Sequence, residues 1–160
     1  MSAVRDPAVL AAVAILLGAV ATGPAVGLLQ VPDAGPAELG TGHADLELSS
    51  VPEAATLSPG TYTDVHRLVV PEIRADLRSV SGTPTVTASV DVDDLGFSRS
   101  SVFALEGGSA GDHSFAISPT TIDSARVQND SYPGRLRLVL RDGRGSTVLV
   151  DESIRVVVTE

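Results

Sequence analysis

The sequence contains no cysteine, no tryptophan and no lysine, and only one methionine among 160 residues. Without cysteine the chain cannot form disulfides, use a thiol nucleophile, bind metal through thiolates or carry a lipid on a cysteine side chain. Aromatic residues make up only 3% of the chain, so the stacking surfaces that nucleic-acid and sugar binders use are scarce. These absences exclude several kinds of chemistry before any motif is considered.

Negative charge dominates the chain, because its 11 basic residues, all arginine, face 20 acidic residues and the net charge is −9. This balance argues against nucleic acid and anionic lipid as partners. In molar salt the Debye length falls to about 3 Å, which screens the self-repulsion. An acidic composition without lysine resembles that of proteins from extreme halophiles. A GC-rich genome, which also favours arginine over lysine, is the alternative explanation.

An uncharged apolar run fills residues 7–32, between Asp6 and Asp33. A membrane-spanning helix needs about 20 such residues. Arg5 precedes the run and acidic residues follow it, so the amino end should stay inside and the remainder should lie outside. We therefore predict a signal anchor at 1–32, in a single-pass cell-membrane protein whose C-terminal domain is outside. Ala19-Val20-Ala21 and Gly23-Pro24-Ala25 both fit a cleavage pattern, so a cleaved signal peptide and a secreted domain are the alternative.

Residues 33–43 are rich in glycine and proline and are predicted to be a linker. From residue 44 to residue 160, apolar and polar residues alternate with a period of two, as in half-buried strands. The strands predicted from this pattern cover 44–48, 64–70, 72–79, 85–92, 101–105, 113–118, 121–127, 135–141, 147–151 and 154–158. A loop is expected from Pro52 to Gly60, and Asp142-Gly143-Arg144-Gly145 should close a hairpin. Short strands at this spacing predict an all-β, antiparallel β-sandwich preceded by one N-terminal hydrophobic helix.

The segment from Tyr132 to Val158 carries a resemblance to a known group of domains. Tyr132-Pro133-Gly134 is followed by alternating leucines and then by Asp142 and Gly145, at a hairpin. This resembles the end of immunoglobulin-like surface domains, in which a tyrosine and a glycine precede an alternating strand and an Asp-x-x-Gly hairpin. The resemblance implies an immunoglobulin-like β-sandwich of the kind found in cell-envelope proteins, and it implies no particular function.

Two local patterns are candidate sites. Asp91, Asp93 and Asp94 resemble the start of a calcium-binding loop, but Leu95 and Val102 stand where an EF-hand needs oxygen ligands. They form a weak calcium candidate against the simpler interpretation of an acidic turn. Asn129-Asp130-Ser131 is a glycosylation sequon in a predicted loop, and Asn129 is the only asparagine of the chain.

Three other patterns favour structural interpretations. Residues 107–111 match G-x-S-x-G, but a strand is predicted after them where a nucleophile elbow needs a helix, so we interpret them as a hairpin loop. His43, His66 and His113 lack metal-ligand spacing and are interpreted as isolated. Four arginines gather on and after one predicted strand and are expected to pair with nearby acidic side chains: Arg135, Arg137, Arg141 and Arg144.

We therefore expect a non-enzymatic cell-envelope protein, structural or interacting, without cofactor. Its expected partners are the membrane, through the N-terminal helix, and other cell-surface proteins. The alternative is a filament subunit of the pilin-like or archaellum-associated kind, which also joins an apolar N-terminal helix to a β domain. A secreted enzyme or ligand-binding protein is a third interpretation, for which no convergent polar cluster is visible.

Overall fold

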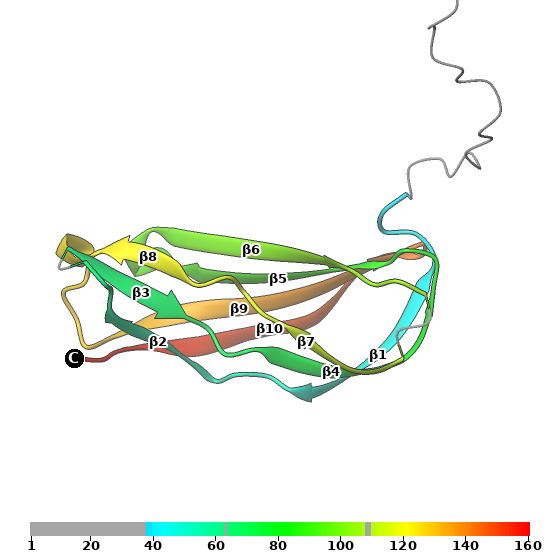
Figure 1. The fold of residues 1–160 in the computed structure, drawn as a ribbon, viewed down its shortest axis with the longest axis horizontal. Helices are drawn as coiled ribbons and strands as arrows, with labels where there is room; N and C mark the ends of the chain where they lie inside the picture. The colour runs from blue at the N-terminus through cyan, green and yellow to red at the C-terminus, as the bar shows by residue number, and fades with distance from the viewer. Residues whose placement is uncertain (1–37, 63, 108–109) are drawn as a thin grey trace, which may run out of the picture. The chain divides into compact units, whose positions relative to one another are not determined.

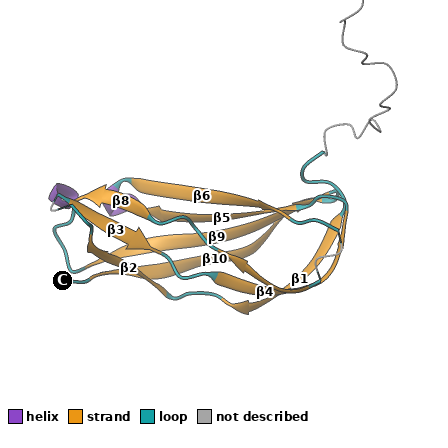
Figure 2. Cartoon of the chain, viewed as in Figure 1, coloured by secondary structure: helices purple, strands orange, loops and turns teal. Residues whose placement is uncertain are grey.

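The computed structural model describes residues 38–62, 64–107 and 110–160. These residues form ten strands and two single-turn 3-10 helices, and Figure 2 shows how strands dominate the described chain. The strands are β1 (His43–Ser50), β2 (Ala54–Pro59), β3 (Val65–Val69), β4 (Ile73–Ser81), β5 (Thr85–Val92), β6 (Phe97–Ala104), β7 (Gly111–Phe115), β8 (Thr120–Asp123), β9 (Ser131–Asp142) and β10 (Gly145–Val158). The helices are η1 (Asp93–Leu95) and η2 (Ser124–Arg126).

The strands form two sheets (Figure 1), so the all-β sandwich expected from the alternation is confirmed. The smaller sheet has the order β1-β4-β7, and the larger has the order β6-β5-β9-β10-β2-β3-β8. All strand pairs are antiparallel except β10 with β2, which run parallel. The expectation of a wholly antiparallel sandwich is therefore wrong for that one pair.

Prolines stand at four of the five places where the described strands pass from one sheet to the other. Pro52 separates β1 from β2, Pro71 separates β3 from β4, Pro84 separates β4 from β5, and Pro119 separates β7 from β8. In each case one strand belongs to the small sheet and the other to the large sheet. Proline has no N–H to donate to a ladder, so a strand that reaches it loses its pairing and can change direction.

The core lies between the sheets and is built from the inward positions of alternating strands. Val86, Ala88, Val90 and Val92 of β5 are all fully buried. Phe115 is also buried, and its ring meets that of Phe103 edge to face, with centroids 5.3 Å apart. Such aromatic pairs add about 0.5–1.5 kcal/mol beyond their buried area.

Four strands differ from the sequence-based expectation. The strand expected at 121–127 ends at Asp123, as β8, and the 3-10 helix η2 follows it. The loop expected at 52–60 contains strand β2, whose six residues end in a proline and carry little alternation. Strand β6 begins at Phe97 instead of residue 101, because its polar first half pairs with β5. The two strands expected after the hairpin, 147–151 and 154–158, are one strand, β10, which continues through the break expected at 152–153. Its register with β9 shifts elsewhere, between Val148 and Val150.

The end of the linker expected at 33–43 is hydrogen-bonded to the sandwich. The N–H of Gly40 donates to the carbonyl of Thr83, and the N–H of Thr83 donates to the carbonyl of Thr41. The described chain thus enters at the end of the sandwich that carries the β9–β10 hairpin, whereas Glu160 lies at the opposite end (Figure 1). The two ends of the domain therefore face in opposite directions.

Within the described residues there is no helix long and apolar enough to cross a membrane. The apolar run at 7–32, on which the signal anchor was predicted, lies outside those residues.

Candidate functional site

The outer face of β6, β5, β9 and β10 is a continuous surface across four neighbouring strands of the large sheet. Register pairs Val102 with Thr87, Thr87 with Val139, and Val139 with Val148, which makes one row across four strands. Val102 and Val148 are 64% and 50% exposed, respectively. We call these four residues the valine row. It gives the face an apolar stripe with only one hydroxyl.

Arginines flank the valine row, and two of them share one carboxylate. Arg135 binds Asp151 with two hydrogen bonds, Nε to Oδ1 at 2.5 Å and Nη2 to Oδ2 at 2.8 Å. Arg137 Nε lies 3.6 Å from the same Oδ2. The hydrogen bond and charge of Asp151 raise the pKa of Arg135, and the hydrogen bond from Arg135 lowers the pKa of Asp151. The pairing expected for these two arginines is confirmed.

The other two arginines of the group do not follow this pattern. Among the described residues, no acidic side chain forms an ion pair with Arg141 or Arg144. The Arg141 side chain instead lies over Gly40, where a Cβ would come within 3.1 Å of it. The backbone N–H of Arg144 donates to Asp142 at 2.8 Å. Cross-strand position alone therefore did not decide which arginine is paired.

The weak calcium candidate lies where β5 ends and η1 begins. Asp91, Asp93 and Asp94 line one surface depression of about 260 Å³, together with Pro133, Gly134 and Arg135. The charges of Asp91 and Asp93 contribute to the raised pKa of Arg135, so an arginine already partly neutralises the site. In the described part of the chain, no three His, Asp or Glu side chains converge as a metal site requires. Calcium binding stays a prediction without a coordination geometry to support it.

The G-x-S-x-G match at 107–111 joins β6 to β7, and residues 108 and 109 lie outside the described chain. The expected strand after the motif is present, since β7 begins at Gly111. The segment is not a hairpin loop, however, because β6 and β7 belong to different sheets. The loop crosses between the sheets. The sequence pattern predicts the two strands but does not show which sheet each of them joins.

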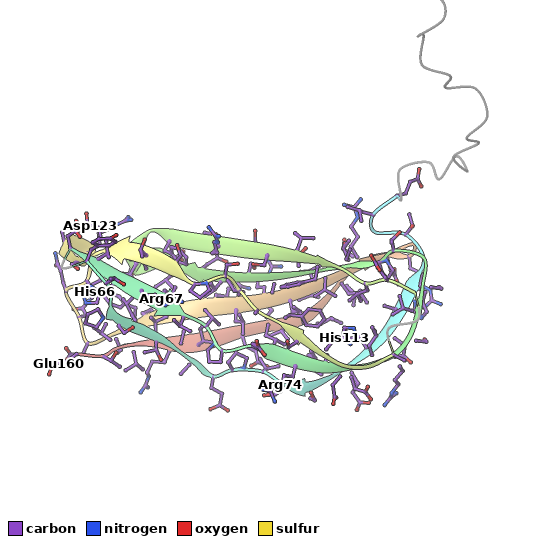
Figure 3. All side chains as sticks on the ribbon, viewed as in Figure 1. His66, Arg67, Arg74, His113, Asp123 and Glu160 are labelled. Atoms are coloured by element: carbon purple, nitrogen blue, oxygen red, sulfur yellow. The ribbon has the colours of Figure 1, made fainter. Side chains whose placement is uncertain are left out.

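The three histidines make three separate contacts. His43 Nδ1 lies 3.1 Å from Asp142 Oδ2, His66 Nδ1 lies 2.9 Å from Ser124 Oγ, and His113 Nδ1 lies 3.1 Å from the carbonyl of Gly111. Figure 3 shows His66 and His113 on different parts of the sandwich. The contact between His43 and Asp142 joins residues 99 positions apart, and no sequence signal pointed to it.

The sequon lies in the loop between η2 and β9, and Asn129 is exposed there. The Tyr132 hydroxyl accepts hydrogen bonds from the backbone N–H groups of Gln128 at 2.6 Å and Asn129 at 2.8 Å. The loop is therefore held by Tyr132, the second residue of the strand that follows it. Glycosylation of Asn129 stays a prediction, with its side chain on the surface.

Two other depressions lie on the sheet surfaces. The larger, of about 550 Å³, is lined by Glu53, Ala54, Ser131, Tyr132, Pro133, Ser153, Ile154 and Arg155. The other, of about 400 Å³, lies on the small sheet and is lined by Ser49, Glu72, Arg74, Asp112, His113 and Ser114. Figure 3 shows Arg74 and His113 on this part of the molecule. Both lie on strand surfaces, and the hydrogen bond of His113 in the second depression is to the backbone carbonyl of Gly111.

No protein-family model and no curated protein matches the chain.

Proposed function

We propose that this protein is a non-enzymatic module of the cell envelope. An N-terminal anchor holds an immunoglobulin-like sandwich outside the cell, where its strand surface contacts other surface proteins. The observation that carries the proposal is the valine row, which places Val102 and Val148 at 64% and 50% exposure on a regular four-strand face. Exposed apolar groups bordered by polar residues are a common feature of protein contact surfaces.

Two features support an immunoglobulin-like domain. In such domains a tyrosine near the start of the sixth strand bonds through its hydroxyl to backbone a few residues earlier. Tyr132, the second residue of β9, makes this contact with Gln128 and Asn129. The division of β4 and β7 into one sheet and of β5, β9 and β10 into the other also matches the immunoglobulin arrangement.

The location is supported by the sequence before the described residues. The uncharged run at 7–32 is long enough to span a bilayer, and Arg5 precedes it while the acidic residues follow. A chain with net charge −9 is well suited to remain soluble at a surface bathed in concentrated salt, where its self-repulsion is screened.

The chain has no cysteine, so single introduced cysteines can report the topology without background. Ser153→Cys places a thiol on exposed β10, and Ser2→Cys places one before the apolar run. On intact cells, a membrane-impermeant maleimide should label Ser153→Cys only, and after lysis it should label both. Labelling of Ser2→Cys alone, or of neither variant, on intact cells would overturn the proposal.

The intact mass of the native protein separates the anchored form from its alternatives. Near-full length in washed membranes supports the anchor. Loss of about 21–25 residues with recovery from the medium would replace the anchor by a cleaved signal peptide. Recovery in sheared surface filaments would favour the filament subunit instead.

A further inference from the structure

Strand β6 is an open edge of the large sheet. All eight of its residues pair with β5 without a register shift, from Phe97 opposite Val92 to Ala104 opposite Thr85. It is the terminal strand of the sheet, and among the described residues no backbone hydrogen bond joins it to any strand but β5. One side of β6 therefore presents unpaired N–H and C=O groups, which are a template for another strand.

The usual protections of such an edge are nearly absent from β6. Natural edge strands are shielded by proline, by bulges, by shortness or by several charges. β6 is eight residues long, has no proline and no bulge, and carries a single charge, on Arg99. Its first half is open to solvent on both faces, because Ser98, Arg99 and Ser100 are all exposed.

We propose that β6 pairs antiparallel with β6 of a second copy of this chain, about a two-fold axis at Val102. This deepens the proposed function by naming its partner, and in that respect it rests on that function. Two copies of a chain with net charge −9 repel each other through most of their surfaces, but β6 carries no acidic residue at all.

The small sheet shows the charge repulsion that pairing at the β6 edge avoids. There Glu47 is opposite Asp76, which is opposite Asp112, so three exposed carboxylates form one row. Contact between two such faces would bring like charges together. The edge at β6 offers backbone hydrogen bonds without that repulsion.

The register follows from Arg99 and from the valine row. Pairing centred on Ser100 would place the two Arg99 residues about 8 Å apart, whereas pairing centred on Val102 places them about 20 Å apart, from a rise of about 3.4 Å and a strand spacing of about 4.8 Å. The second distance exceeds the Debye length of about 8 Å at physiological salt, so the repulsion is screened. Centring on Val102 also brings its two copies side by side, which joins the valine rows of both molecules into one stripe.

The pairing of two β6 edges makes only a small contact. Stable interfaces bury about 1,200–2,000 Å², and one pair of strands buries less, so association in dilute solution should be weak. Crosslinking at a chosen residue detects a weak, specific contact better than a measurement of size does.

The test uses the full chain, purified in mild detergent, with single cysteines at three exposed positions of one face: Ser100→Cys, Val102→Cys and Ala104→Cys. Directly opposite residues have Cα atoms about 4.5–5.5 Å apart, within disulfide reach. Only residue 102 meets its own copy, because residues 100 and 104 lie about 14 Å from theirs. Under oxidised glutathione, Val102→Cys should form dimers at least tenfold faster than either neighbour, and a mixture of the other two variants should form the mixed dimer.

Ser153→Cys, on an internal strand, measures random collision, and unchanged circular dichroism shows that the fold is kept. Equal rates at the three β6 positions, or fastest dimerisation of Ser100→Cys, would overturn the proposal. The partner of the β6 edge would then be a strand of another protein. The outcome is separable from the cell-surface role. If Val102→Cys crosslinks selectively but surface labelling fails, the self-association stands and the cell-surface location is wrong. If surface labelling succeeds but Val102→Cys does not crosslink selectively, the location stands and the self-association is wrong.

Discussion

Nδ1 of His43 lies 3.1 Å from Oδ2 of Asp142, which joins the first residue of β1 to the last residue of β9. Asp142 also accepts a hydrogen bond from the backbone N–H of Arg144 at 2.8 Å. The hydrogen bond from His43, followed by that from Arg144, lowers the pKa of Asp142. One carboxylate thus closes the β9–β10 turn and ties it to the start of the domain.

Asp142→Asn should change how stability depends on pH. Because the pKa of Asp142 is lowered by folding, its contribution is present above the ordinary aspartate value of about 3.9 and is lost as pH falls through the lower folded-state value. The variant should be less stable than the wild type at pH 7, and the difference should shrink below about pH 4. Denaturant unfolding between pH 7 and pH 2.5 measures this. Asp45→Asn, on the exposed face of β1, is the control, and identical profiles for the two variants would contradict the assignment.

Asp151→Asn should lower the denaturation midpoint, because two arginines lose their shared partner. Part of the loss should disappear between 0.1 and 1 M salt, as the Debye length falls from about 10 Å to about 3 Å. Another part should persist, since the two hydrogen bonds from Arg135 to Asp151 are weakened by the substitution at any salt concentration. The adjacent Glu152→Gln is the matched control, and the two variants should differ. A salt-independent effect would show that charge is not the cause.

Tyr132→Phe removes the hydroxyl that accepts the N–H groups of Gln128 and Asn129. We expect a loss of about 1–3 kcal/mol in the free energy of unfolding, because the backbone donors lose their partner. Tyr62→Phe removes a hydroxyl from a ring that is 74% exposed, and should change stability by less than about 0.5 kcal/mol. Equal effects of the two substitutions would mean that the Tyr132 contact contributes nothing.

Gly42→Ala should be among the most damaging substitutions of the domain. A Cβ at Gly42 would lie 1.9 Å from the carbonyl oxygen of Ser81, and its φ of +83° disfavours any other residue. Backbone strain and overcrowding together should cost about 3 kcal/mol or more. Gly107→Ala, which would meet no atom closer than 3.9 Å, should leave the thermal midpoint nearly unchanged. A tolerated Gly42→Ala would show that the β1–β4 contact can open there.

The strands that could be predicted are those in which the period of two is strong. β4, β5 and β9 alternate over eight or more residues, and their inward positions are buried as expected. β2 could not be predicted, because this short segment that ends in a proline is held by pairing with β10 on one side and with β3 on the other. The ion pairs of the arginines could not be predicted either. Arg135 and Arg141 each lie opposite a serine of β10, Ser153 and Ser146. Arg135 is paired because Asp151 lies two residues from Ser153 on the same strand.

The amino-acid sequence by itself determined that residues 44–160 are β-structured, which side chains of β4, β5 and β9 face the core, and where the final hairpin turns. These properties are local, because alternation and turn chemistry act over a few neighbouring residues. Only the tertiary structure decided that the chain changes sheet at four prolines, that β6 is an open edge, and that His43 meets Asp142. Those relationships join residues far apart in the chain, and they depend on which strands come to lie side by side once the core is buried.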